Sequence, residues 1–292
     1  MSFAIFDENY YLASYPDVQA AVDAGAFSSG LQHFEQFGLA EGRAAVSPYY
    51  DEQFYLRANP DVAAAVDAGA FSSGLQHYIY FGEAERRSAG AFNETGYLNL
   101  YPDVAAAVDA GTYSSGLQHY IQAGQFEARM SLFSGTSGHD VITGFGQGDR
   151  GIIGVSPNDL ENNLLSGVAV TGTGEVDVLI GAEGADGFLL GYPSLTPLNF
   201  PPQQFYVGGG DTDYALIQNF EPFVDVVMLS GSLEDYNLQT VNGNFSISTA
   251  SGDLIGIVEG IEALMPLPVS GEVLGQVTGL PSNLFGSIVA LV

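Results

Sequence analysis

Four aspartates recur after residue 130, each five residues after a glycine and close to an apolar residue. They occupy the sixth place of four nine-residue windows, Gly135–Thr143 (Asp140), Gly144–Ile152 (Asp149), Gly172–Ile180 (Asp177) and Gly181–Leu189 (Asp186). Glycine permits tight loops, and carboxylates with loop carbonyls are the hard oxygen ligands that Ca²⁺ prefers. The spacing therefore predicts stacked, calcium-binding turns of a parallel β-roll.

The pattern is degenerate, which leaves a second interpretation open. Thr136 and Ala182 stand where a second glycine is usual, Glu175 replaces a glycine, and Gly151 takes an apolar place. Turns that keep glycine and aspartate also form without ions, because an aspartate side chain accepts hydrogen bonds from nearby backbone. Residues 156–171 separate the two pairs of windows and predict a loop or short helix and then a strand. This break limits the expected ions to roughly two to four.

The windows resemble the RTX nonapeptide family of exported calcium-binding proteins, and Phe205–Gly231 resembles the closing segment of such domains in cyanobacteria. The resemblance implies that the carboxylate ligands of Ca²⁺ are Asp140, Asp149, Asp177 and Asp186, with Asp211 and Asp213 as additional ones. Asp177 and Asp186 are the foremost pair. From Asp225 to Leu264, short apolar runs alternate with Gly, Asn and Asp turns, which predicts antiparallel strands that cap the roll.

The first 130 residues contain one unit three times, at about residues 6–43, 50–87 and 92–129. The period indicates an array of supersecondary units. Each unit predicts a helix that stops before a proline, a second helix that ends at a glycine, and a third helix capped by serine. The shared motif, YL then PDV, SGLQHY, FG and EGR, resembles a repeat of secreted bacterial, particularly cyanobacterial, calcium-binding and surface proteins. The resemblance implies no catalysis.

Equivalent histidines in the three repeats, His33, His77 and His119, leave two interpretations open. Three imidazoles could share a metal ion if the repeats packed around an axis. Repeats stacked in a row keep equivalent positions about one repeat apart, which favours histidines that pack or form hydrogen bonds inside each repeat. The tyrosines are likewise core residues or a platform on which sugars stack.

The composition narrows the classes of function. The 292 residues include 34 acidic residues, six arginines and no lysine, for a formal net charge of −28, which disfavours nucleic acid and anionic lipid as partners. There is no cysteine, so disulfides and thiolate chemistry are excluded. We find no HExxH motif, nucleophile elbow or phosphate loop, and therefore expect a protein without enzymatic activity.

The termini bear on localisation. The N-terminal residues lack the basic start and apolar core of a secretory signal peptide, and no stretch of about 18 apolar residues predicts membrane insertion. Residues 266–292 form an apolar tail. In the RTX family an uncleaved C-terminal segment is the signal for one-step, type I export, so the resemblance implies a secreted or cell-surface protein. Alternatively, Phe285–Val292 is a strand that docks on a neighbouring molecule.

The sequence thus predicts an α+β chain with helical repeats in residues 1–130, a degenerate calcium-binding parallel β-roll with antiparallel capping strands in 131–265, and the tail in 266–292. The expected function is that of a secreted, calcium-binding structural protein that forms homo-oligomers or polymers, such as a filament, sheath or surface layer. The alternative is a calcium-dependent adhesion module that binds cell-surface glycans, and a secreted hydrolase is a third interpretation.

Overall fold

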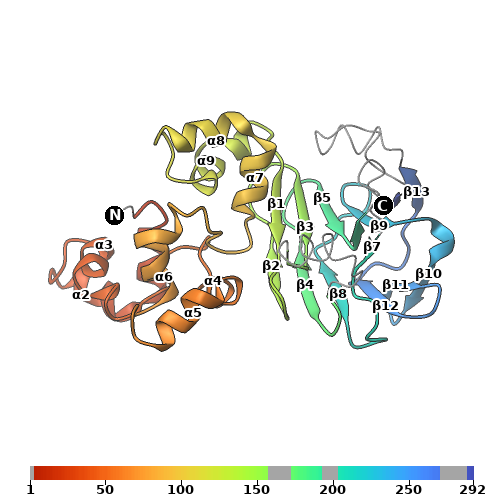
Figure 1. Cartoon of the computed structure of the whole chain (residues 1–292), viewed down its shortest axis with the longest axis horizontal. Helices are drawn as coiled ribbons and strands as arrows, with labels where there is room; N and C mark the ends of the chain where they lie inside the picture. Colours follow the sequence, from red (N-terminus) through yellow and green to blue (C-terminus); the bar gives the residue numbers. More distant parts are fainter. Residues whose placement is uncertain (1–2, 157–171, 193–202, 270–287) are drawn as a thin grey trace. The chain divides into compact units, whose positions relative to one another are not determined.

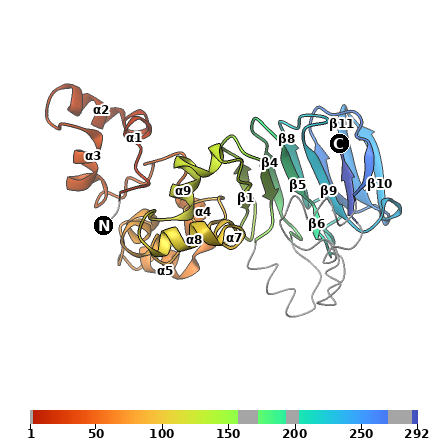
Figure 2. The ribbon, with the colours of Figure 1, turned by 90° about the horizontal axis from the view of Figure 1, so that it is seen from above.

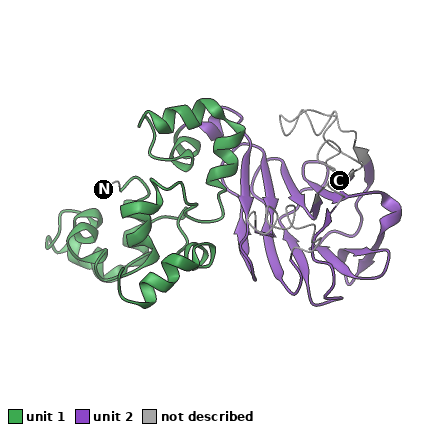
Figure 3. Ribbon diagram, in the orientation of Figure 1, with its two compact units in different colours: residues 1–122 green, residues 123–292 purple. Residues whose placement is uncertain are grey.

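The computed structural model describes residues 3–156, 172–192, 203–269 and 288–292. The chain divides into two compact units, residues 1–122 and 123–292 (Figures 1 and 3). Helices fill the first unit and two mixed sheets the second, which confirms the α+β class. The predicted boundary at residue 130 lies between this division and the first strand, which begins at Ser131. The loop or strand expected in residues 156–171 falls, after Ser156, outside the described residues.

The helical unit follows the predicted repeat, because its start and stop signals are local. Asp7, Asp51 and Asn93 cap the first helix of each repeat by accepting a hydrogen bond from a backbone N–H three residues later. A proline begins each second helix, where the first-turn N–H needs no partner. The helices are α1 (Glu8–Ser14), α2 (Pro16–Asp23), α3 (Gly30–His33), α4 (Glu52–Ala58), α5 (Pro60–Asp67), α6 (Gly74–His77), α7 (Glu94–Leu100), α8 (Pro102–Asp109) and α9 (Gly116–Gln122). The π-helical turns η1 (Phe34–Gly38) and η2 (Tyr78–Gly82) extend α3 and α6, and a 3-10 turn η3 (Gly124–Phe126) follows α9.

A glutamate at the start of the first helix joins it to the third helix in every repeat. The carboxylate of Glu94 accepts hydrogen bonds from the backbone N–H groups of Gly116 (2.6 Å) and Leu117 (2.9 Å). Glu8 and Glu52 make the same pair of bonds in their own repeats. The first N–H groups of a helix have no partner within it, so this glutamate caps the third helix from a distance of 22 residues in the chain.

The second unit contains two six-stranded sheets and a short third one. One sheet has the order β1 (Ser131–Ser134), β3 (Arg150–Ile153), β5 (Asp186–Leu189), β9 (Val226–Ser230), β14 (Ile288–Leu291), β13 (Pro266–Val269). The other has the order β10 (Tyr236–Val241), β11 (Asn244–Thr249), β12 (Leu254–Val258), β8 (Tyr214–Gln218), β4 (Val176–Ile180), β2 (Val141–Thr143). The pair β6 (Gly191–Tyr192) and β7 (Gln203–Gln204) forms the third.

Parallel pairing links β1, β3, β5 and β9 in the first sheet, and β2, β4, β8 and β12 in the second. Along the chain these strands alternate between the two sheets (Figure 2). Each strand from β1 to β9 in these two sheets contributes at least one fully buried apolar side chain, namely Phe133, Ile142, Ile152, Leu179, Phe188, Ile217 and Val227. The remaining pairs, β10 with β11, β11 with β12, β9 with β14 and β14 with β13, are antiparallel.

The C-terminal strand lies inside its own sheet. Ile288–Leu291 pairs with β9 on one side and with β13 on the other, where the sequence left open a docking strand for a neighbouring molecule. Among the described residues, β13 is the last strand on this side of the sheet. Met265 exchanges two backbone hydrogen bonds with Val292 (2.9 and 3.1 Å). In the alternating antiparallel pattern the backbone N–H of Leu267 therefore also points to β14, whereas the backbone nitrogens of Pro266 and Pro268 point away from β14.

Candidate cation site in the stacked turns

Turn aspartates in one sheet stack on each other across the parallel strands. Asp140 and Asp177 are both buried, and the backbone N–H of Asp140 donates to Oδ1 of Asp177 at 2.8 Å. Oδ2 of Asp140 accepts hydrogen bonds from the backbone N–H (2.7 Å) and the hydroxyl (2.9 Å) of Thr136 in its own turn. The Asp140 carboxylate therefore holds its own turn together, and the Asp177 carboxylate joins its turn to that of Asp140.

Asp177 has an unusual environment for a carboxylate. The Tyr206 hydroxyl donates to its Oδ2 at 2.6 Å, and the side chain is fully buried. Burial raises the pKa of Asp177 to about 7, although the hydrogen bonds from Tyr206 and Asp140 lower this pKa. The carboxylate is therefore costly to keep ionised at neutral pH.

The other sheet repeats the arrangement with different residues. The backbone N–H of Asp186 donates to Oδ1 of Asp225 at 2.9 Å, and each carboxylate accepts a backbone N–H of its own turn, from Ala182 (2.9 Å) and Glu221 (2.8 Å). Burial raises the pKa of Asp225 to about 6. Asp177 and Asp186, the foremost predicted pair, thus belong to different sheets, and each stacks on a partner outside that pair.

Two further carboxylates, those of Asp213 and Asp253, each lie against the glycine loop of residues 208–210. Asp213 Oδ2 accepts from the N–H of Gly174 at 3.0 Å, and Asp253 Oδ2 accepts from the N–H of Gly208 at 2.6 Å. Their other oxygens, Asp213 Oδ1 and Asp253 Oδ1, are buried without a hydrogen-bond partner among the described residues. A Cβ at Gly209 would lie 2.3 Å from Asp213 Oδ1, so the loop can lie this close to the Asp213 carboxylate only with glycine at position 209.

The remaining predicted ligands, Asp149 and Asp211, are exposed. The residue in register with Asp186 on β3 is Arg150, which is 2% exposed. The nine-residue pattern missed Arg150, Asp225 and Asp253. A simpler signal, an aspartate directly before an apolar strand, finds the two aspartates (Asp225-Val-Val and Asp253-Leu-Ile).

The three repeat histidines each lie next to a tyrosine of their own repeat. Nδ1 lies 3.0 Å from the hydroxyl oxygen in His33–Tyr11, 2.9 Å in His77–Tyr55 and 3.0 Å in His119–Tyr97. Across the described ranges, no group of three or more His, Cys, Asp or Glu side chains is arranged to hold a metal ion. The hydrogen-bonding interpretation therefore describes these histidines.

The residues around the glycine loop fit a divalent cation better than the other turns do. At Asp140, Asp177, Asp186 and Asp225, donors of the chain already occupy carboxylate oxygens. At Asp213 and Asp253 one oxygen each is desolvated with no donor among the described residues, which is costly unless a cation binds it. A calcium ion would be held by Asp213 and Asp253, beside a loop whose glycines can offer backbone carbonyls.

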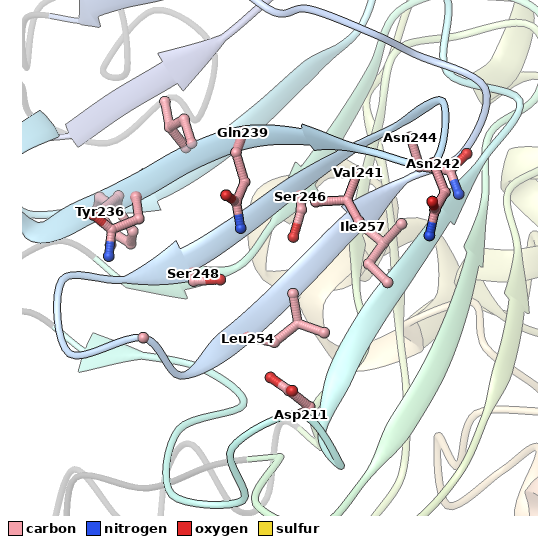
Figure 4. Close-up of a pocket in the computed structure, with 13 residues that line it drawn as sticks. Asp211, Tyr236, Gln239, Val241, Asn242, Asn244, Ser246, Ser248, Leu254 and Ile257 are labelled. Atoms are coloured by element: carbon pink, nitrogen blue, oxygen red, sulfur yellow. The ribbon is translucent and has the colours of Figure 1, made fainter.

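A separate pocket of about 780 Å³ lies on the face of β10, β11 and β12 (Figure 4). Amides and hydroxyls line it in register, because Asn237 lies opposite Ser248 and Gln239 opposite Ser246. Asp211 reaches its rim, and Leu254 and Ile257 supply apolar surface. Such a lining can form hydrogen bonds with a polyhydroxylated ligand.

No family model, curated protein or solved structure matches this chain. Within the described ranges, the helices are all too short or too polar to cross a lipid bilayer. The function is therefore inferred from the residues and their geometry.

Proposed function

We propose that residues 131–265 form a calcium-stabilised parallel β-roll capped by antiparallel strands, and that the protein is a secreted structural protein that assembles with copies of itself. Alternation of the parallel strands between two sheets supports the roll, because one coil of a roll contributes one strand to each sheet. The buried carboxylate oxygens without partners beside the glycine loop support the position of an ion there.

The observation that carries the calcium proposal is the pair of buried carboxylate oxygens without partners in the described part of the chain, Asp213 Oδ1 and Asp253 Oδ1. Calcium would supply the positive charge and the oxygen coordination that these atoms lack. Binding free energy at such a site is also folding free energy. A chain of this kind stays loosely folded where calcium is scarce and completes its fold outside the cell.

Exposed apolar side chains support self-assembly. Phe37 and Phe81 occupy the same position in the first and second repeats and are 48% and 50% exposed. Phe223, at the turn before β9, is 76% exposed. Exposed apolar surface that gathers into patches is typical of contact sites between proteins. Assembly through the repeats would use the first two repeats, because the third has Ala123 at the position of Phe37 and Phe81.

The calcium proposal predicts a loss of ion binding in the Asp213→Asn variant. The wild-type chain should bind calcium by titration calorimetry and melt at a higher temperature in millimolar calcium than in chelator. Free calcium at 100 times the dissociation constant stabilises a fold by about 2.7 kcal/mol. The asparagine side chain keeps an oxygen acceptor for the N–H of Gly174 but lacks the charge, so this gain should largely disappear.

Asp211→Asn is the matched control, because this residue is in the same loop but exposed. It should bind calcium as the wild type does. A wild-type chain that melts at one temperature in calcium and in chelator contradicts the proposal. Sedimentation and electron microscopy of the same samples would show whether calcium also drives assembly, and a monomer at every calcium concentration would contradict self-assembly.

The pocket on β10–β12 favours a second candidate function, the binding of a glycan. Gln239→Ala should weaken binding to a responsive glycan about tenfold, the effect of removing hydrogen bonds worth about 1.4 kcal/mol. A glycan array identifies the ligand, and calorimetry measures its affinity. Gln36→Ala, at an exposed position in η1, is the control. An array without any hit on the wild-type chain excludes this candidate for the glycans tested.

A further inference from the structure

Arg150 is an arginine enclosed within the second unit. It begins β3, and its side chain is fully buried. Its Nε donates to Asp186 Oδ1 at 2.5 Å and one terminal nitrogen donates to Asp186 Oδ2 at 3.4 Å. The guanidinium also donates to three backbone carbonyls, those of Gly146 (2.7 Å), Gly148 (2.9 Å) and Glu183.

These oxygens come from two stacked turns of the same sheet. Gly146 and Gly148 belong to the turn before β3. Glu183 belongs to the turn before β5, the next strand in the sheet, and Asp186 is the first residue of β5. One carboxylate and three carbonyls are a set of oxygen donors suited to a hard divalent cation. The guanidinium satisfies them with its fork of N–H donors and a permanent charge.

The surrounding backbone leaves room for this side chain. A Cβ at Gly144 would lie 3.0 Å from Arg150 Cδ, and a Cβ at Gly184 would lie 3.3 Å from a terminal nitrogen. Gly184 also has a φ of +106°, a conformation that other residues rarely adopt. The two turns are therefore shaped around the arginine.

We propose that the Arg150 guanidinium takes the place of a calcium ion between these two turns, so that this level of the coil is held by a cation built into the chain. The inference rests on the proposed β-roll function and refines it. The two stacked turns that Arg150 joins to Asp186 then form at any calcium concentration. The level of Asp213 and Asp253, where the described hydrogen-bond partners are backbone N–H groups and not a cationic side chain, depends on the ion. Calcium dependence is thus confined to the later turns.

The test is the Arg150→Ser variant of the full chain, which leaves the oxygens of the two turns without their cation. In chelator, the equilibrium constant for unfolding of the second unit should rise on the order of 10²- to 10³-fold, as for other buried charges that lose a partner. Millimolar calcium should restore most of this loss. Equilibrium dialysis should find one more bound calcium than in the wild type.

Arg43→Ser is the matched control, because Arg43 pairs with Asp17 on the surface of the helical unit. It should neither gain an ion nor change the calcium response. Adding Asp186→Asn to Arg150→Ser should abolish the gained ion. Arg150→Lys keeps a positive charge and should fold in chelator without gaining an ion, which tests the inference even if Arg150→Ser does not fold in chelator.

The outcomes separate the inference from the proposed function. If the wild type binds calcium but Arg150→Ser gains no ion and is not restored by calcium, the inference is overturned and the proposed function stands. An extra ion in Arg150→Lys also overturns the inference. If the wild type is indifferent to calcium while Arg150→Ser gains an ion and is restored, the proposed function fails and the substitution of arginine for a cation stands.

Discussion

Replacing Glu94 by alanine should raise the equilibrium constant for unfolding of the helical unit about 100-fold. Glu94 is 3% exposed, burial raises its pKa, and its carboxylate is the partner of two backbone N–H groups at the start of α9. Alanine leaves both groups buried without an acceptor, at about 1–3 kcal/mol each. Urea denaturation followed by circular dichroism measures the change.

Glu8→Ala is the matched control for this prediction. Glu8 makes the same two hydrogen bonds, to Gly30 and Leu31, at the same distances of 2.6 and 2.9 Å. Its side chain is only half-buried, so water can replace the carboxylate in the variant. In Glu8→Ala the equilibrium constant for unfolding should therefore rise only about tenfold. Equal losses at the two positions would show that burial does not set the strength of this cap.

The second large effect is a change in the pH dependence of stability on replacing Asp177 by asparagine. Burial raises the pKa of Asp177 to about 7, so the folded chain holds this proton more tightly than the unfolded chain, in which the pKa is near 3.8. In chelator, stability should therefore fall as pH rises from about 4 to about 7. The full difference corresponds to at most about 4 kcal/mol.

Asparagine carries no charge, so Asp177→Asn should lose most of this slope and gain stability relative to the wild type at a pH of about 8. A smaller slope should remain, because the pKa of Asp225 is also raised, to about 6. Melting temperatures between about pH 4 and pH 8 measure the effect. Asp211→Asn, with an exposed side chain, should keep the wild-type slope. An unchanged slope in Asp177→Asn would mean that this carboxyl titrates at an ordinary pH.

The helices were predictable because their signals are local. Pro16, Gly25 and Ser29 mark starts and stops within a few residues of the elements that they control. The π-helical turn that ends the repeat was not predictable, since it depends on a contact across the repeat. A Cβ at Gly82 would lie 2.2 Å from the Tyr55 hydroxyl oxygen, so this glycine accommodates a side chain 27 positions earlier.

The candidate site was predicted in its residue types but not in its pairs. Spacing identified Asp140 and Asp177, but their stacking joins residues 37 positions apart and depends on the register of parallel strands. Arg150 was missed because the nine-residue pattern assigned the site to its neighbour Asp149. A one-residue difference along a strand exchanges the buried face for the exposed one, and the pattern does not resolve it.

The proline-bearing strand β13 has a consequence for how copies of the chain can add to one another. A second chain that paired with this edge would find no N–H donor at Pro266 or Pro268, and so would lose two hydrogen bonds of a normal ladder. The edge of β13 therefore opposes the extension of one sheet from molecule to molecule. If copies of the chain meet at β13, their contact there would therefore rest on side chains and not on a continuous backbone ladder.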